Sequence, residues 1–312
     1  MTYEDLDAEW NNSSEIECHT SGSTGNPKII RLPKVQMLMS AKRTAEFFGL
    51  TKDSLLYSCI SPDYIGGKMM FVRQQLLSCR FAWETPSNKP LQNYKGDTIS
   101  LLSVVPSQML YILDNIKEMP EIQNILIGGS SIPVSLRKRI ASSGLNAYES
   151  YGMTETSSHI AIRKIQDGNE PFKTLGDITV DNYNGALEIN IPGWQKLRTN
   201  DVAHILSPSE FFILGRLDNV IISGGLKINP ERIEDKLSPY IECPFIVTSV
   251  PDEKWGQRLV LIAECKDSMI DEISDICRTV LESHERPKEI HTISSIPRTP
   301  NGKLIRKYDQ FP

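Results

Sequence analysis

Apolar and polar positions follow two different periods along the chain. Residues 34–48 show the helical period, and Gly49 follows them as a stop signal. Short apolar runs are typical of buried strands, and here each is followed by a stretch with helical spacing. Strands that alternate with helices predict an α/β fold with a mostly parallel sheet. The predicted elements are strands at 15–19, 100–105 and 125–127 and helices at 34–48, 107–116 and 133–140.

The pattern changes after Tyr151, where short alternating strands predict a β-rich subdomain. The segment Gly215–Asp218 is the best candidate for a domain boundary. We therefore predict a large N-terminal domain at 1–215 and a small, mobile α+β C-terminal domain at 216–312. The predicted elements are strands at 185–191, 211–214, 245–250 and 259–264 and helices at 230–237 and 268–281.

Composition excludes several classes of function. The net charge of −5 argues against a nucleic-acid footprint or a polybasic membrane patch. No apolar run approaches the roughly 20 residues that span a bilayer, and residues 1–17 are too acidic and polar for a signal peptide. The six cysteines are scattered without a C-x-x-C pair, so we expect reduced, structural thiols in a cytoplasmic protein. The five histidines show no metal-ligand spacing.

A glycine- and hydroxyl-rich loop closed by a lysine, at His19–Lys28, is the first chemical signal. Backbone N–H groups, small hydroxyls and one cation together suit a polyphosphate. It is not a Walker A loop, because Lys28 follows Pro27 where that motif requires Gly-Lys. Taken alone, the same composition is also typical of a flexible surface loop.

Three further motifs follow in order: Tyr151–Glu155, Gly215–Asp218 and Pro297–Lys303. Together with His19–Lys28 the set resembles the adenylate-forming acyl-CoA ligase superfamily over residues 19–307. The resemblance implies an enzyme that activates a carboxylic acid with ATP and Mg²⁺ and transfers the acyl group to CoA. It also implies a large α/β domain followed by a smaller α+β lid.

The resemblance assigns roles to residues of the first three-quarters of the chain. Tyr151 would contact the adenine, Thr154 the α-phosphate, and Glu155 a magnesium ion; an exposed turn that starts a short helix is the alternative. Asp201 and Arg216 would bind the ribose, although an aspartate that caps a turn looks the same in sequence. The resemblance places further nucleotide contacts at Thr20, Ser21, Gly22, Ser23, Thr24, Gly25, Lys28, Gly128, Gly129, Ser130, Ser150, Gly152 and Met153.

The C-terminal motifs imply a moving domain. Asp218 matches the family hinge, and Gly224 and Gly225 match a loop that lines the pantetheine tunnel, with an ordinary hairpin turn as the alternative. Lys303 is the predicted catalytic cation, which would stabilise charge between the acid oxygen and the α-phosphate. Without the surrounding Pro-Arg-Thr-x-Asn-Gly-Lys context, it would read as a solvated lysine in a basic tail.

The chain departs from the family pattern at three points. It has only 18 residues before His19, so a large N-terminal subdomain is expected to be missing. Relatives often carry Thr-Gly-Asp where this chain has Thr199-Asn200-Asp201. Tyr64 replaces a histidine before the Gly66-Gly67 pair of the acyl pocket, where it would wall the pocket or simply pack in the core.

Spacing and brevity are most similar to short bacterial o-succinylbenzoate–CoA ligases of menaquinone biosynthesis. Such a dicarboxylate needs a cation for its distal carboxylate, and Lys68, Arg73 and Arg163 are the candidates. Another aryl or fatty acid, or transfer to a carrier protein, remains an alternative within enzymes. A non-catalytic nucleotide-binding module is the alternative from another class. Apolar surface exposed by the short N-terminus also suggests a homodimer.

Overall fold

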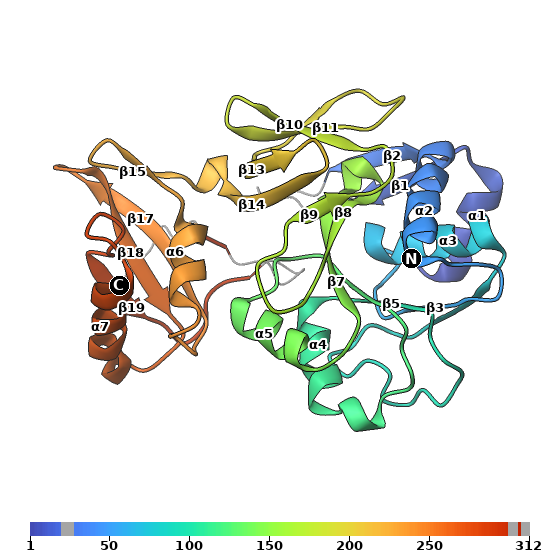
Figure 1. The fold of residues 1–312 in the computed structure, drawn as a ribbon, viewed down its shortest axis with the longest axis horizontal. Helices are drawn as coiled ribbons and strands as arrows, with labels where there is room; N and C mark the ends of the chain where they lie inside the picture. The colour runs from blue at the N-terminus through green and yellow to red at the C-terminus, as the bar shows by residue number, and fades with distance from the viewer. Residues whose placement is uncertain (20–27, 299–304, 307–312) are drawn as a thin grey trace. The chain divides into compact units, whose positions relative to one another are not determined.

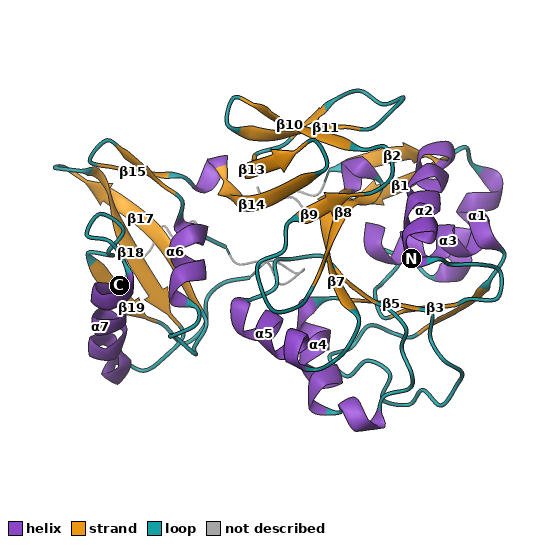
Figure 2. Ribbon diagram, viewed as in Figure 1, coloured by secondary structure: helices purple, strands orange, loops and turns teal. Residues whose placement is uncertain are grey.

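Two compact units make up the protein, and the computed structural model describes residues 1–19, 28–298 and 305–306 (Figure 1). The first unit comprises residues 1–132 and 136–178, and the second comprises residues 133–135 and 179–312. Helices and strands alternate through the first unit, whereas the second begins with strands alone (Figure 2).

The main sheet of the first unit has the strand order β9-β8-β7-β6-β5-β3-β4. Neighbours from β4 to β7 run parallel, while β8 and β9 return antiparallel. The carboxyl ends of the parallel strands therefore share one edge, which is where ligands bind in open α/β sheets. The strands are β3 Leu55–Ser58, β4 Arg80–Trp83, β5 Leu101–Val104, β6 Ile125–Ile127, β7 Ala147–Met153, β8 Ser158–Lys164 and β9 Phe172–Thr174.

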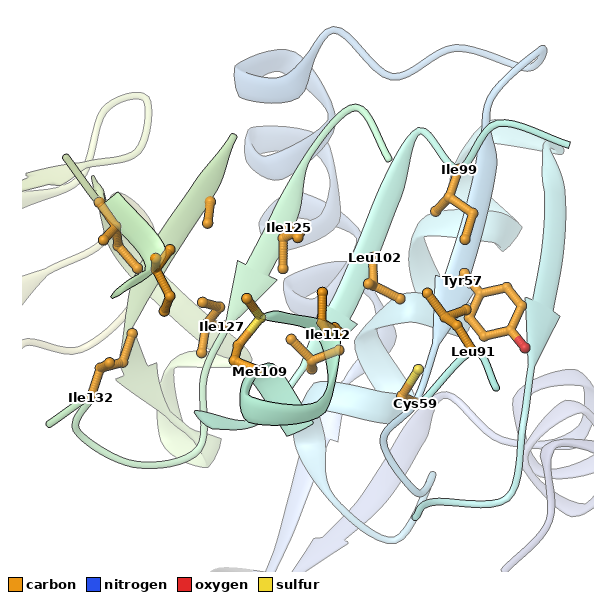
Figure 3. Close-up of a cluster of buried hydrophobic side chains, with 14 of the residues drawn as sticks. Tyr57, Cys59, Leu91, Ile99, Leu102, Met109, Ile112, Ile125, Ile127 and Ile132 are labelled. Carbon is orange, nitrogen blue, oxygen red and sulfur yellow. The ribbon is translucent and has the colours of Figure 1, made fainter. Parts of the chain in front are cut away.

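Both faces of this sheet are covered by helices, because alternate residues of each strand point to opposite faces. Leu101 and Leu126 belong to a core shared with helices α2 (Lys34–Phe48) and α3 (Ile65–Leu77). Leu102 and Ile127 belong to a second core with α4 and α5 (Figure 3). Those two helices span Pro106–Asp114 and Val134–Ser142. The buried strands thus read as continuous apolar runs.

A helix and a hairpin precede the main sheet. Helix α1 spans Tyr3–Asn12 and buries Tyr3, Leu6 and Trp10, which recur at helical spacing. Strands β1 (Glu15–His19) and β2 (Ile29–Pro33) pair antiparallel. Helix α1 and the hairpin join one core with α2 and α3.

The second unit begins with antiparallel strands and ends with an α+β domain. Its first sheet has the order β10-β11-β12, and β13 pairs with β14. Its last sheet has the order β16-β15-β18-β17, with β19 parallel to β18. Helices α6 and α7 cover this sheet through one apolar core. The elements are β10 Thr179–Tyr183, β11 Ala186–Asn190, β12 Leu197–Arg198, β13 Asp201–Ser207, β14 Glu210–Arg216, β15 Ile221–Ser223, β16 Leu226–Ile228, α6 Pro230–Leu237, β17 Phe245–Asp252, β18 Gly256–Ala263, α7 Ile270–Val280 and β19 Glu289–Thr292.

Four 3₁₀ turns complete the described chain: η1 Ile116–Glu118, η2 Thr154–Thr156, η3 Leu217–Asn219 and η4 Asp267–Met269. The predicted α/β fold and the helices at 34–48 and 230–237 are confirmed. The helix predicted at 268–281 is wrong in its first turn, which is the 3₁₀ turn η4. Helix α1 was not predicted. The predicted domain boundary at Arg216 stays a prediction.

Candidate active site

The carboxyl end of β7 carries the Tyr151–Glu155 motif. Tyr151, Gly152 and Met153 are the last residues of the strand, which bulges between Tyr151 and Gly152. A Cβ on Gly152 would lie 2.2 Å from the carbonyl oxygen of Ser158 on β8. Only glycine fits this approach, so the backbone stays close and flat where the motif turns.

The motif then enters the 3₁₀ turn η2. Thr154 is buried there, whereas Glu155 is exposed. The turn is pinned by the hydroxyl of Thr156, which donates to the carbonyl oxygen of Met153 at 2.9 Å. The hydroxyl of Ser40 on α2 donates to the carbonyl oxygen of Ser157 at 2.9 Å. These hydrogen bonds fix the backbone of the turn that carries Thr154 and Glu155.

The Gly128–Ser130 loop lies next to this strand, because it follows β6 and β6 pairs in parallel with β7. Ser150 donates its hydroxyl hydrogen to the carbonyl oxygen of Ile127 at 3.0 Å. A Cβ on Gly128 would lie 2.7 Å from the Ser150 hydroxyl oxygen. The structure thus brings two of the predicted nucleotide segments together at the shared edge.

The predicted acyl-pocket motif follows β3 on the same edge. Tyr64 precedes α3 and is 43% exposed, so it is not a core tyrosine. Gly67 is buried, and a Cβ there would lie 2.3 Å from the carbonyl oxygen of Ser61. The hydroxyl oxygen of Tyr3 lies 3.1 Å from the carbonyl oxygen of Ile60 and 3.3 Å from that of Gly67. Sequence reasoning missed Tyr3, because nothing in the acidic start of the chain marks it.

The three candidate cations differ sharply in surroundings. Arg163 is neutralised, since its Nη2 atom lies 2.7 Å from Oε2 of Glu149. The Nζ atom of Lys68 is 2.8 Å from the sulfur of Met1, and burial lowers the pKa of Lys68. Arg73 is 1% exposed, and burial lowers its pKa to about 9.

Arg73 has only neutral partners within the described residues. Its Nη2 donates to the Thr44 hydroxyl oxygen at 3.3 Å, its Nη1 contacts the sulfur of Met70 at 3.5 Å, and its Nε has no hydrogen-bond partner there. The Thr44 hydroxyl also lies 3.0 Å from Nε2 of His159. His159 pairs with Gly152 across β7 and β8, so Thr44 and His159 connect this buried guanidinium to the predicted nucleotide strand.

His159 is another residue that sequence reasoning did not select. It is buried between Thr44 and Ser158, whose hydroxyl lies 3.3 Å from Nδ1. Burial, together with the nearby Arg73 charge, holds the pKa of His159 well below its usual value. A lone histidine in a strand whose residues are buried on both faces gives no sequence signal that could have identified it.

The second unit holds the predicted ribose and hinge residues together. The Nη1 atom of Arg216 donates to Oδ1 of Asp201 at 3.0 Å. Its Nε and Nη2 atoms form a fork on the carboxylate of Asp218, at 2.9 and 3.0 Å. The amide of Asp201 donates to the Thr199 hydroxyl oxygen at 3.0 Å, which fixes the turn despite the unusual Asn200.

Gly224 and Gly225 form the turn between β15 and β16, with φ of +57° and +83°. Both values lie in the left-handed region that glycine adopts readily. A Cβ on Gly224 would also lie 2.7 Å from the Trp255 ring. The alternative of an ordinary hairpin turn is therefore correct for the local geometry, and the tunnel role stays a prediction.

Several predicted residues lie outside the described part of the chain: Thr20, Ser21, Gly22, Ser23, Thr24, Gly25 and Lys303. The flanks of the phosphate-loop candidate are placed, because His19 pairs with Ile29 at the end of the hairpin and Lys28 precedes it. In the second unit the amide of Ile305 donates to the carbonyl oxygen of Pro297 at 2.9 Å. The two flanks of the Lys303 segment are therefore joined.

Within residues 1–19, 28–298 and 305–306, no three His, Cys, Asp or Glu side chains come together as metal ligands. None of the helices in those ranges has the length and apolarity required to cross a bilayer.

Comparison with known proteins identifies the family. The family model described as AMP-binding enzyme matches residues 11–183, and the model of the AMP-binding enzyme C-terminal domain matches residues 241–303. The 2-succinylbenzoate–CoA ligase of Enterococcus faecalis is 27% identical over 329 residues, which cover 92% of this chain and 67% of that protein. The enzyme of the same name from Listeria monocytogenes is 28% identical, over 92% and 68% of the two chains.

Solved structures agree with this. An acyl-CoA synthetase (AMP-forming)/AMP-acid ligase II-like protein from Dyadobacter fermentans is 29% identical, covers 97% of this chain and 91% of its own, and has a TM-score of 0.64. The Bacillus subtilis o-succinylbenzoate CoA synthetase bound to its acyl-adenylate has a TM-score of 0.80 at 22% identity, over 93% and 67% of the two chains, which supports the fold. Because the first family model alone matches more than half of the chain, this protein belongs to the AMP-binding enzyme family.

Proposed function

We propose that this enzyme is an acid–CoA ligase that activates o-succinylbenzoate. The substrate carboxylate attacks the α-phosphate of ATP, which gives an acyl-adenylate and pyrophosphate. The CoA thiolate then attacks the acyl carbon and AMP leaves. The observation that carries the proposal is the match over nine-tenths of the chain to relatives named 2-succinylbenzoate–CoA ligase.

The nucleotide would bind along the shared carboxyl edge of β6 and β7. Tyr151 offers a half-buried ring for the adenine, and Thr154 offers a hydroxyl for the α-phosphate. In the second unit the buried carboxylate of Asp201 suits two ribose hydroxyls, with Arg216 beside it. We assign the phosphates to Thr20–Lys28 and the transition-state charge to Lys303.

Magnesium fits the single exposed carboxylate of Glu155. In nucleotide enzymes Mg²⁺ is bound through one or two carboxylates and the substrate phosphates, which agrees with the absence of a three-residue ligand cluster in the described ranges. When bound, the ion would neutralise phosphate charge. Glu155 follows Thr154 in the η2 turn, so both residues come directly after the carboxyl end of β7, where we propose that the nucleotide binds.

The distal carboxylate of the substrate would pair with Arg73. Of the three candidate cations, Arg163 already has a carboxylate partner, and the Lys68 ammonium lies against a sulfur. Arg73 is buried with neutral partners within the described residues, so its charge is uncompensated there. A substrate carboxylate would supply the missing negative charge, and the fork of a guanidinium matches that group.

The proposal also concerns the pathway, the acyl acceptor, the compartment and the oligomeric state. From the resemblance to ligases of menaquinone biosynthesis we propose that pathway for the present chain, with CoA as acceptor and the cytoplasm as compartment. Rotation about Asp218 would exchange Lys303 for the Gly224-Gly225 turn between the two half-reactions. A homodimer stays a prediction that sedimentation would test.

ATP–pyrophosphate exchange against a panel of acids tests the proposal. The panel contains o-succinylbenzoate, benzoate, and short and long fatty acids, and each is repeated with CoA to detect thioester. Exchange and thioester with o-succinylbenzoate alone would support the proposal. Exchange with another acid would overturn the substrate, exchange without CoA transfer would favour a carrier protein, and silence with retained ATP binding would favour a binding module.

A further inference from the structure

Two cysteines that lie 22 positions apart in sequence face each other at the end of the β17–β18 ladder. Phe245 pairs with Ala263 as the last assigned pair of these antiparallel strands. The ladder continues one step further, because the amide of Glu264 donates to the carbonyl oxygen of Pro244 at 2.8 Å. The next opposed pair in this direction is Cys243 and Cys265.

The position of this pair within the ladder brings the two backbones close. Pro244 and Glu264 occupy a hydrogen-bonded position, and the two kinds of position alternate along antiparallel strands. Cys243 and Cys265 come next, at bends just beyond the two strands, and continued alternation would give them a non-hydrogen-bonded position, where Cα atoms are about 4.5 Å apart and side chains are closest. That separation lies within the range of about 4.4–6.8 Å that disulfides span.

The side chains also point the right way. Both are half-buried and pack against the apolar core beneath α6 and α7, on the same face as Phe245. Interaction with the Cys265 side chain contributes to the raised pKa of Cys243. Cys277, the third cysteine of this core, is almost fully buried on α7.

We propose that Cys243 and Cys265 are a modification site at which an intramolecular disulfide forms by exchange with a low-molecular-weight disulfide such as oxidised glutathione. The thiolate of one of the two cysteines attacks one glutathione sulfur, and one glutathione thiolate leaves. The thiol of the other cysteine then loses its proton and attacks the protein sulfur of the mixed disulfide, which releases the second glutathione. The two protein thiols lose two electrons and two protons, and one glutathione disulfide becomes two glutathiones.

The thiolate is the nucleophile, and burial raises the pKa of Cys243 to about 11. Exchange should be slow near neutral pH and should accelerate with rising pH, as the thiolate population grows.

The site adjoins the chain that leads to the predicted catalytic lysine. Glu264, next to Cys265, accepts a hydrogen bond from the amide of Ile296 at 2.6 Å and lies 3.7 Å from the guanidinium of Arg298. A disulfide would tie this anchoring strand to its neighbour and oppose fraying of the strand ends. The chemistry of the site does not depend on the function proposed above.

The test uses the 312-residue chain in glutathione redox buffers at about pH 7.0 and 8.5, between which the thiolate population of a thiol with a pKa of about 11 rises about 30-fold. Aliquots are quenched with acid, alkylated, digested and mapped by mass spectrometry without reduction. We expect loss of two of the six thiols, a cross-linked peptide joining Cys243 to Cys265, and faster loss at the higher pH. Cys277→Ser is the matched control and should still lose two thiols.

Three results would overturn the inference. The wild-type chain could retain all six thiols in a strongly oxidising buffer, carry stable glutathione adducts on both Cys243 and Cys265, or link either of them to Cys277. Cys243→Ser should instead trap a glutathione adduct on Cys265. Because the decisive mapping is done on the wild-type protein, the outcome does not depend on whether a serine variant folds.

Discussion

Replacement of Arg73 by methionine should raise stability and damage activity at the same time. The guanidinium is buried, and the fall of its pKa from 12.5 to about 9 corresponds to about 5 kcal/mol of burial cost for the ionised form, at 1.36 kcal/mol per pH unit. Methionine has a similar length and no charge to desolvate. It loses the hydrogen bond to Thr44, worth about 1 kcal/mol. We expect the free energy of unfolding at pH 7 to rise by about 1–4 kcal/mol.

The activity of the same variant tests the carboxylate pairing. 4-Oxo-4-phenylbutanoate has the reacting carboxylate of o-succinylbenzoate but lacks the carboxylate on the ring. In the wild-type enzyme Arg73 should favour the dicarboxylate, and in Arg73→Met the preference in kcat/KM should fall by about 10–10³-fold. Loss of preference between two acids separates pairing with the substrate from general damage to the protein.

Urea unfolding and pyrophosphate exchange provide the two measurements. Arg139→Met is the matched control, since Arg139 is an exposed arginine on α5 that lies 2.6 Å from Asp114. It should change stability by less than about 1 kcal/mol and leave the acid preference unchanged. A lower free energy of unfolding for Arg73→Met than for the wild type would refute the claim that the Arg73 charge is buried without a compensating partner. An unchanged preference between the two acids would refute the pairing, even if the stability gain appeared.

Four further changes test other parts of the structure. Tyr3→Phe should raise KM for the acid several-fold at unchanged KM for ATP, because its hydroxyl holds the loop before α3; equal changes in both constants would argue for a general effect. Gly152→Ala should abolish exchange or destabilise the protein by about 2 kcal/mol or more, since the new Cβ meets the β8 backbone; wild-type activity and urea midpoint would contradict this. His159 stays neutral in the folded protein but protonates in the unfolded chain below about pH 6.5. The free energy of unfolding should therefore fall by about 1.4 kcal/mol for each pH unit below that value. The variant His159→Asn should show a weaker dependence of this free energy on pH over the same range. Lys303→Ala should slow adenylation by about 10²–10³-fold and spare thioester formation from a supplied acyl-adenylate, and equal loss in both steps would reject its role.

Local signals explain which parts of the fold could be predicted. The helix at 34–48 ends at Gly49, which adopts φ of +62° as a left-handed cap, and the helix at 230–237 begins with Pro230 at its first turn. Helix α1 escaped prediction because its three buried side chains lie among acidic and polar residues. Its burial depends on a core formed by distant segments, which a local pattern does not contain.

Some residues of the candidate site could also be predicted from local motifs, whereas others depend on contacts between distant segments. Motifs that combine glycine with a particular neighbour, as at Gly152, could be found because the backbone contact they permit is tied to the sequence itself. Arg73 could be proposed as one cation among three but not chosen, since the choice depends on which carboxylate each one already contacts. The opposition of Cys243 and Cys265 follows only from strand pairing.

The register of the apolar strands in the central sheet depends on polar residues at the strand ends. Because β5 is buried on both faces, sliding it by one residue would keep all of its side chains in the interior, so burial alone would oppose the slip only weakly. Side chains at the strand ends do oppose it. The hydroxyl oxygen of Ser100 accepts a hydrogen bond from the amide of Leu55 at 3.1 Å, and the side-chain amide of Asn124 donates one to the carbonyl oxygen of Ser100 at 3.0 Å. These few exposed or half-exposed amides and hydroxyls therefore set the alignment of the strands, and a deletion beside them would shift the whole catalytic edge while leaving hydrophobic content unchanged.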